Sequence, residues 1–429
     1  MTTTQSTTRQ DLPHQPIDGS PAPPPPRVVP PSPTGAVVAT RAAIARAIMR
    51  RAVKSLPIRV YFPDGTYWGN GRESDPRMLL HRPAAFFARL GVDAKLGFGE
   101  AYMAGDWDAA PGTDLGELLT PFATNLTTLV PLPLQRFRSL VDRRQPAAEE
   151  NTLSQSRQNI HRHYDLSNDL FTAFLDETLN YSSAWFEPGD DLAAAQRRKM
   201  DSILDFANVR PNCDVLEIGT GWGDLAIRAA QRGANVTSVT LSKEQRELAM
   251  ERVQLAGVSD RVRIELKDYR QVTGKYDAIV SVEMLEAVGM RYWPTFFATL
   301  DRLLRPGGQV GLQTITMPHD RMLATRRSYT WIHKYIFPGG IIPSVRAIED
   351  VLSAHTGLAI TDGRALGPHY ATTLGCWREN FLANWTTISR KGFDSTFRRM
   401  WEFYLAYCEA GFRADYLDVH QFRLARVAG

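Results

Sequence analysis

The stretch from Val215 to Gly223 constrains the fold more than any other part of the chain. Its apolar run, Val215 to Ile218, has the length and composition of a buried strand, and residues with helical spacing begin at Asp224. Glycines occupy positions 219, 221 and 223 between the two. A strand, a glycine turn and a helix form the first unit of a nucleotide-binding α/β fold, because a turn without Cβ atoms lets the backbone approach a ligand closely.

The same alternation continues downstream. Strands are expected at 235–240, 262–266, 276–281 and 309–315, with helices at 243–255 and 293–304. This order predicts a mostly parallel sheet with its ligand at the carboxyl ends of the strands. A dinucleotide-binding turn would carry its third glycine one residue later. With Glu217 at the strand end, the turn instead resembles that of S-adenosylmethionine-dependent methyltransferases with a Rossmann-like class I fold.

Composition narrows the class of protein. The 429 residues are enough for two or three domains, and 43% hydrophobic with 22% charged residues is ordinary for a globular protein. Three widely spaced cysteines, Cys213, Cys376 and Cys408, suggest neither a disulfide framework nor a zinc site, which fits a cytoplasmic location. No apolar run reaches 18 residues and no secretion signal is visible, so neither a membrane-spanning helix nor export is expected.

The chain divides into four segments. Residues 1–36 are rich in proline and threonine and are expected to be disordered. A small α+β domain is expected at 37–124, a linker at 125–150, and the catalytic domain with a helical cover at 151–429. Within the last segment, residues 345–429 are expected to be mainly helical.

Residues 37–55 are expected to form a basic helix that carries no acidic side chain. Such a helix can lie on an anionic membrane surface, although a helix packed on its own domain explains the pattern equally well. Polar and aromatic residues gather between 161 and 186 and suggest a flap over the ligand. His161 and His163 have no second cluster at ligand spacing, so no metal site is expected.

Several ordered motifs together resemble the cyclopropane-fatty-acyl-phospholipid synthase family, from about Leu56 onward and most strongly from His163 to Gly340. They are His-Tyr-Asp-Leu-Ser-Asn-Asp at 163–169, Tyr-Ser-Ser at 181–183, Glu-Ile-Gly-Thr-Gly-Trp-Gly at 217–223, Thr-Leu-Ser-x-x-Gln at 240–245, Ser-Val-Glu-Met-Leu-Glu at 281–286, Lys-Tyr-Ile-Phe-Pro-Gly at 334–339 and His-Tyr-Ala-Thr-Thr-Leu at 369–374. The resemblance implies a small N-terminal domain for dimerisation and lipid presentation. It also implies S-adenosylmethionine as cofactor, held by residues of these motifs. The expected cofactor residues are Tyr164, Tyr181, Ser182, Glu217, Gly219, Gly221, Trp222, Gly223, Thr240, Gln245, Asp268 and Tyr269.

Two of these expectations carry a qualification. Many Rossmann-type sites place a carboxylate after the second strand to hold the ribose, whereas Thr240 and Gln245 offer neutral groups here. For Trp222, core packing is the less favoured alternative.

The resemblance also implies the chemistry. An isolated alkene is a poor nucleophile, so it needs the strongly electrophilic methyl group of a sulfonium, and its reaction leaves a carbocation that water must not reach. Aromatic faces stabilise such a cation, and Tyr335 is one candidate. The cyclopropane-forming members use a bound bicarbonate as base. Of its five expected ligands, Glu286, Ile315 and Tyr370 match the family pattern, while Ser183 and Gln313 replace a cysteine and a histidine. Bicarbonate is therefore doubtful here.

The departures at Ser183 and Gln313 favour the branch that forms 10-methylene fatty acids, the precursors of 10-methyl (tuberculostearic-type) acids. The expected reaction is C-methylation of an oleoyl-type chain in a phospholipid, with cyclopropane formation as the alternative. The expected partners are the inner face of the plasma membrane, a second copy of the chain in a homodimer, and a separate reductase. A small-molecule methyltransferase and a catalytically inactive lipid-binding protein remain as other readings. No basic stripe interleaved with aromatic residues points to nucleic acid.

Overall fold

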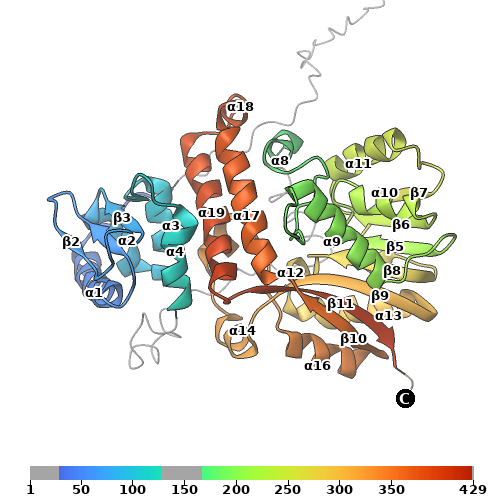
Figure 1. Ribbon diagram of the computed structural model, residues 1–429. Coiled ribbons are helices and arrows are strands. Elements are labelled where there is room, and N and C mark those ends of the chain that lie inside the picture. Colours follow the sequence, from blue (N-terminus) through green and yellow to red (C-terminus); the bar gives the residue numbers. More distant parts are fainter. Residues whose placement is uncertain (1–28, 127–166, 428–429) are drawn as a thin grey trace, which may run out of the picture.

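The computed structural model describes residues 29–126 and 167–427. Within these residues a seven-stranded sheet has the order β10-β11-β9-β8-β5-β6-β7 (Figure 1). Its strands are β5 (Asp214–Ile218), β6 (Asn235–Thr240), β7 (Val262–Leu266), β8 (Tyr276–Val282), β9 (Leu304–Thr316), β10 (Leu358–Ala365) and β11 (Asp418–Arg426). The first five run parallel, while β11 is antiparallel to both of its neighbours. The predicted Rossmann-like class I fold is confirmed.

Helices cover both faces of this sheet because its strands present apolar residues on both sides. On one face pack α9 (Leu192–Phe206) and α10 (Asp224–Gln231), which bury Val215 and Ala278. On the other face pack α13 (Trp293–Leu303) and α16 (Val345–His355), which bury Leu216 and Ile279. The edge beside β7 is covered by α11 (Lys243–Leu255). Short helices complete the connections: α12 (Leu285–Val288), α14 (His319–Thr325), α15 (Trp331–Tyr335), and the 3-10 turns η2 (Tyr269–Gln271) and η3 (Met290–Tyr292).

A helical layer stands between this sheet and the N-terminal part of the molecule (Figure 1). Its long members are α17 (Gly367–Ala383) and α19 (Ser395–Arg413), and its short ones are α8 (Asn168–Phe174) and α18 (Trp385–Ser389). The large aromatic residues Phe174, Trp377 and Trp401 are buried within it. One of its helices, α17, carries Tyr370, a residue of the site described below.

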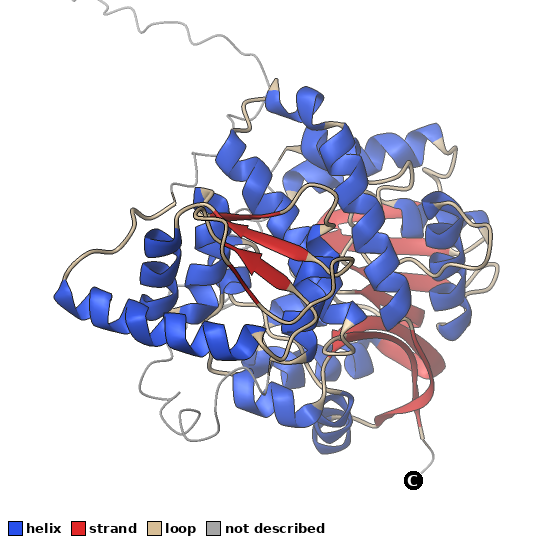
Figure 2. Ribbon diagram, turned by 60° about the vertical axis from the view of Figure 1, so that its left-hand side comes forward, coloured by secondary structure: helices blue, strands red, loops and turns tan. Residues whose placement is uncertain are grey.

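The N-terminal part is a small α+β unit (Figure 2). Its elements are α1 (Ala36–Val53), β1 (Arg59–Tyr61), β2 (Tyr67–Trp68), β3 (Arg77–Leu80), α2 (Pro83–Val92), α3 (Ala94–Ala104), β4 (Trp107–Ala109) and α4 (Leu115–Thr124). The four strands have the order β2-β1-β3-β4. Both α3 and α4 pack on α19, and Phe403 of α19 lies against Trp107 and Trp331. The two parts therefore share one aromatic core.

Residues 345–429 are mainly helical, as expected, but two strands that were not foreseen, β10 and β11, also lie in this segment. The strands β10 and β11 form an antiparallel pair at one end of the sheet. Their sequences hide the alternation of a strand, because His420, Gln421 and Arg423 interrupt the apolar residues of β11. The expected tail and linker fall largely on residues 1–28 and 127–166, outside the described residues.

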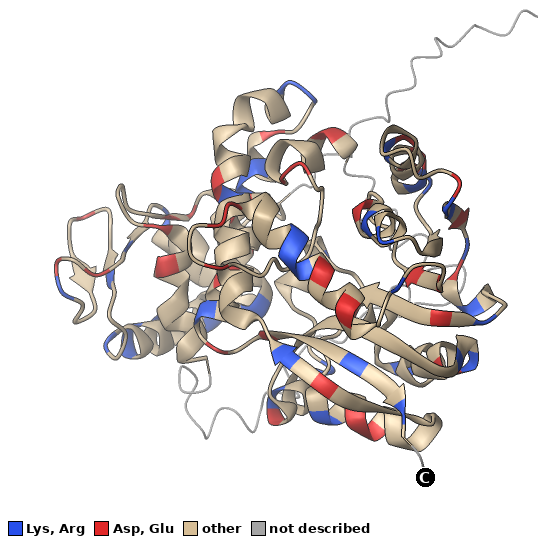
Figure 3. Ribbon diagram, turned by 45° about the vertical axis from the view of Figure 1, so that its right-hand side comes forward, with Lys and Arg blue, Asp and Glu red and all other residues tan. Residues whose placement is uncertain are grey.

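Charged residues of both signs are interspersed along the described elements rather than collected in one block (Figure 3). Among the described residues, no helix combines the length and the apolar character needed to cross a membrane.

Candidate active site

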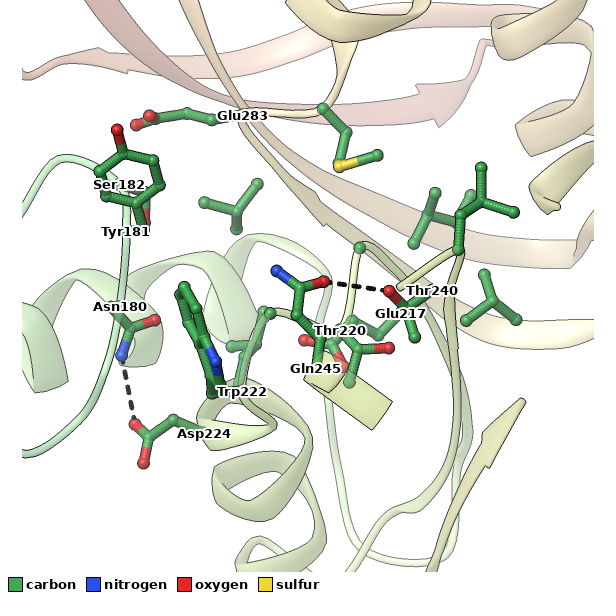
Figure 4. Close-up of a pocket in the computed structure, with 18 of the residues that line it drawn as sticks. Asn180, Tyr181, Ser182, Glu217, Thr220, Trp222, Asp224, Thr240, Gln245 and Glu283 are labelled. Carbon is green, nitrogen blue, oxygen red and sulfur yellow. Dashed lines mark hydrogen bonds between the residues drawn. The ribbon is translucent and has the colours of Figure 1, made fainter. Parts of the chain in front are cut away.

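A pocket opens at the carboxyl ends of β5, β6 and β8, where the parallel order of the sheet predicts a ligand site (Figure 4). The glycine turn after β5 forms its floor, and the segment 179–182 lies across it. The described residues that line it are Leu179, Asn180, Tyr181, Ser182, Glu217, Ile218, Gly219, Thr220, Gly221, Trp222, Asp224, Leu225, Val239, Thr240, Leu241, Gln245, Lys267, Tyr269, Val282, Glu283 and Met284.

The glycine turn is shaped for close approach of a ligand. Gly219 has a φ of 99°, and a Cβ at this position would lie 2.7 Å from the Cγ atom of Met284. Trp222 lines the pocket and also packs in the core, with its indole N–H donating to Asn168 Oδ1 at 2.9 Å and its ring 4.8 Å from that of Phe171. Trp222 therefore lies both at the pocket, as expected for a cofactor residue, and in the core.

Neutral polar groups line the far end of the pocket. Thr240 Oγ1 donates to Gln245 Oε1 at 3.0 Å (Figure 4). Glu217 is turned toward the sheet, where Ser238 Oγ donates to its carboxylate at 2.5 Å, and burial raises the pKa of Glu217 to about 8. This end can hold a ribose through hydroxyl and amide groups.

The segment across the pocket is fastened from behind by α9. The Lys199 ammonium donates to Ser182 Oγ at 2.6 Å, and Gln196 Nε2 donates to the Ser182 carbonyl at 2.9 Å. Both side chains are fully buried. At the other side, Asn180 Nδ2 donates to Asp224 Oδ2 at 3.4 Å (Figure 4). The segment thus presents Asn180, Tyr181 and Ser182 to a ligand in fixed positions.

A buried carboxylate, Glu283, lies at the end of the pocket beside this segment (Figure 4). It accepts hydrogen bonds from the Ser183 backbone N–H at 2.9 Å, from Gln313 Nε2 at 2.9 Å and from the Tyr370 hydroxyl at 2.8 Å. Burial raises the pKa of Glu283, and these three donors oppose the rise. Its φ of 52° is unfavourable for a residue with a side chain. Such strain is typical of functional positions.

Glu286 and Ile315 contact each other and do not contact Glu283 through a hydrogen bond. The Glu286 carboxylate accepts from the Ile315 backbone N–H and from Thr314 Oγ1, the latter at 2.8 Å. Burial is the main cause that raises the pKa of Glu286 to about 8, and the Glu283 charge adds to it. Of the five expected base-binding residues, Ser183, Gln313 and Tyr370 therefore converge on Glu283.

This arrangement does not fit a bicarbonate ion. The donors that would hold the ion are already engaged by Glu283, and the Glu283 carboxylate would repel a further anion. A carboxylate of the protein itself, Glu283, accepts the hydrogen bonds of Ser183, Gln313 and Tyr370.

Of the expected cofactor residues, nine line the pocket. These are Tyr181, Ser182, Glu217, Gly219, Gly221, Trp222, Thr240, Gln245 and Tyr269. Asp268 is turned away, because its carboxylate caps η2 and pairs with Arg270 at 2.6 Å. Gly223 begins α10 and does not line the pocket. Tyr164 lies outside the described residues.

Among the expected catalytic residues, Tyr335 points away from the cluster: its hydroxyl donates to Glu100 of α3 at 2.9 Å. Glu283 was not among the residues predicted from the sequence. It directly follows β8, which ends at Val282, and ligands bind at the carboxyl ends of parallel strands, so its position could have indicated it. Sequence reasoning also missed Asn180, Asp224 and Lys267, which no motif distinguishes.

Comparison with known proteins agrees with this geometry. Residues 151–422 match the family described as mycolic acid cyclopropane synthetase. The tuberculostearic acid methyltransferase UfaA1 of Mycobacterium tuberculosis is 52% identical over 402 residues, which cover 92% of this chain and 93% of that protein. The cyclopropane-fatty-acyl-phospholipid synthase of Escherichia coli (strain K12) is 36% identical, with 82% and 89% covered.

Solved structures are similar as well. The cyclopropane synthase MmaA2 from Mycobacterium tuberculosis has a TM-score of 0.58 and 34% identity, covering 63% of this chain and 98% of that one. The mycolic acid cyclopropane synthase CmaA1, solved with SAH and CTAB, has a TM-score of 0.58 and 32% identity, covering 65% and 98%. The chain is therefore an S-adenosylmethionine-dependent methyltransferase and belongs to the mycolic acid cyclopropane synthetase family.

Proposed function

We propose that the enzyme methylates the double bond of a monounsaturated, oleoyl-type acyl chain in a phospholipid and gives a 10-methylene branch. The observation that carries this proposal is the buried Glu283 carboxylate, held by three donors at the end of the cofactor pocket. The similarity to a tuberculostearic acid methyltransferase supports it.

S-adenosylmethionine, when bound, supplies an electrophilic methyl group. Asn180, Ser182 and Asp224 would hold its amino-acid end, and Thr240 with Gln245 would hold its ribose, since all five line the pocket. The glycine turn removes the side chains that would obstruct it. Glu283 lines the same pocket, so the proposal places the base beside the bound cofactor.

Residues of the protein then stabilise the positive charge that methyl transfer leaves on the acyl chain, and one of them removes a proton. Tyr181 lines the pocket and is backed by Phe171, Phe174 and Trp377, with ring centroids 5.1 to 6.1 Å apart. Aromatic faces stabilise a nearby cation, and their packing excludes water that would quench it. A hydride shift from the methylated carbon to the cationic neighbour moves the charge, and Glu283 removes one proton from the added methyl group. The electrons of that C–H bond form the exocyclic double bond.

The test is incubation of the full chain with S-adenosylmethionine and vesicles of oleoyl phospholipid, followed by proton NMR of the released methyl esters. Exocyclic vinylidene protons support the proposal. Upfield cyclopropane protons would assign the alternative product, and the absence of an added CH2 with cofactor binding intact would refute acyl methylation altogether.

A pair of substitutions tests the role of Glu283. Glu283→Gln keeps the size of the side chain and removes the base, so we expect kcat to fall by about 10²- to 10⁴-fold with S-adenosylmethionine affinity retained. Glu286→Gln changes a matched buried carboxyl group three residues further along the chain and should lose far less. Equal losses in both variants would contradict the assignment of the base to Glu283.

We also propose that the enzyme works at the inner face of the plasma membrane and docks through α1. Val37 and Ile44 are 68% and 55% exposed, and Arg41 lies on the same helix face at helical spacing. Each basic side chain near an anionic surface contributes about 1 kcal/mol. Ile44→Glu should weaken sedimentation with phosphatidylglycerol vesicles. Unchanged sedimentation would contradict docking through α1.

We also propose two partner proteins for this enzyme, a reductase and a second copy of the same chain. A methylene product still contains a double bond, so a separate reductase must saturate it to give a 10-methyl chain. We expect the enzyme itself to be a homodimer. Mass photometry at nanomolar concentration checks the second point, and a monomer mass would refute it.

A further inference from the structure

A line of buried polar side chains crosses three neighbouring strands and ends at Glu283. Gln313 on β9 stands directly opposite Gln421 on β11, and Gln421 stands opposite Arg364 on β10. Gln313 and Gln421 are fully buried. Sheets bury apolar residues at such positions, and each amide placed there must find all of its hydrogen-bond partners within the protein.

Each partner is present. Arg364 Nη1 donates to Ser202 Oγ at 2.9 Å, and Ser202 Oγ donates to Gln421 Oε1 at 2.6 Å. Gln421 Nε2 donates to Gln313 Oε1 at 2.9 Å and to the Lys199 carbonyl at 3.1 Å. Gln313 Nε2 then donates to Glu283 Oε1 at 2.9 Å and to the Ser183 carbonyl at 3.3 Å. Both N–H groups of each amide are used.

The direction of the hydrogen bonds along this line of side chains follows from its outer end, Arg364. A guanidinium can only donate, so Ser202 must use a lone pair for Arg364 and its proton for Gln421. Gln421 consequently receives through its oxygen and donates through its nitrogen, and the same holds for Gln313. Arg364 is itself held in place, because its guanidinium lies 4.0 Å above the ring of Trp185.

We propose that Arg364, Ser202 and Gln421 are positioning residues that keep the Gln313 amide turned with its N–H groups toward Glu283, and so keep the base ionised and aimed. Without these residues the Gln313 oxygen loses its donor, Gln421, and only Glu283 and the Ser183 carbonyl hold the amide in this orientation. The inference rests on the proposed role of Glu283 as base. None of the three residues lines the cofactor pocket.

The other charged or titratable groups around Glu283 do not replace this donor. Tyr370 of α17 donates to the second oxygen, Oε2. Lys199 of α9 favours the ionised form from a distance, while the Glu286 carboxylate of α12 and Glu283 repel each other. Loss of the Gln313 donor therefore leaves Oε1 with only the Ser183 N–H, and the pKa of Glu283 rises further.

The experiment follows the titration of Glu283 in the full-length chain by two readouts. One is the acid limb of the single-turnover rate against pH. The other is the carboxylic-acid band in difference infrared spectra, assigned by its loss in Glu283→Gln. Ser202→Ala and Gln421→Leu should each move the midpoint upward by about one pH unit, the size of one hydrogen bond to a charged group. Ser202→Thr keeps the hydroxyl and should titrate as the wild type.

Ser344→Ala is the matched control, since it removes another buried hydroxyl that caps α16 far from this chain. Wild-type midpoints in Ser202→Ala and Gln421→Leu, with thermal destabilisation like that of Ser344→Ala, would overturn the proposal. If Gln421→Leu does not fold, the midpoints of Ser202→Ala and of Arg364→Met, which changes a half-buried residue, test the proposal by the same criterion. Because the infrared band needs no turnover, a wild type that forms no branched product refutes the proposed function while leaving this test intact.

Discussion

Substitution of Glu286 by Gln tests whether this buried carboxyl group is neutral in the folded protein at pH 7. Burial raises its pKa from 4.5 to about 8. The folded protein therefore holds a proton that the unfolded chain releases above pH 4.5, and stability falls as the pH rises from there toward 8. At roughly 1.4 kcal/mol per pKa unit, the free-energy cost is about 1 kcal/mol at pH 5 and about 5 kcal/mol at pH 9.

The amide of the variant has no proton to lose and keeps an acceptor for Thr314 and Ile315. We therefore expect the stability of Glu286→Gln relative to the wild type to increase by about 4 kcal/mol between pH 5 and pH 9. Urea unfolding followed by tryptophan fluorescence, with equal m values in both proteins, measures this difference. Glu217 titrates in both proteins and cancels. A constant offset across the pH range would refute the argument from burial.

Three further substitutions probe other parts of the structure. Gly219→Ala places a Cβ 2.7 Å from Met284 Cγ at a φ of 99°. Calorimetry of this variant should therefore detect no S-adenosylmethionine binding. Wild-type affinity would contradict a role of the glycine turn in cofactor binding. Tyr370→Phe removes a donor to Glu283, raises the pKa of that carboxyl and should move the acid limb of kcat upward, whereas an unmoved limb would separate Tyr370 from the base. Arg378→Met leaves Glu409 buried beside only Arg413 and should lower the unfolding free energy by about 3 kcal/mol in urea, and a loss below about 1 kcal/mol would show that Arg413 suffices.

The cofactor half of the site was predictable because its signals are local in sequence. A strand, a glycine turn and a helix occupy consecutive residues, and the ends of the next strands follow from the same alternation. Gly219, Trp222, Thr240 and Gln245 could therefore be named before their positions were known, and all four line the pocket. Asp268 failed for an equally local reason, since Arg270 two residues later engages its carboxylate.

The catalytic half depends on contacts between distant segments. Motif matching selected Glu286, whereas Glu283 receives Ser183, Gln313 and Tyr370 from up to 100 residues away. Only the three-dimensional fold decides which of two glutamates three positions apart faces the cluster. Gln421 was hidden for a second reason: it lies on β11, in a region whose polar residues conceal the strand.

The position of β11 between β9 and β10 imposes an order on folding. Although β10 precedes β11 in the chain, β10 joins the sheet only through β11, and β11 pairs with β9 over a separation of about 100 residues. Pairings this distant form slowly, because a long loop must close first. The cofactor cradle, built from β5 to β8, needs none of them. The contact that holds the Gln313 amide thus depends on the most distant strand pairing of the sheet, whereas the glycine turn depends only on nearer ones.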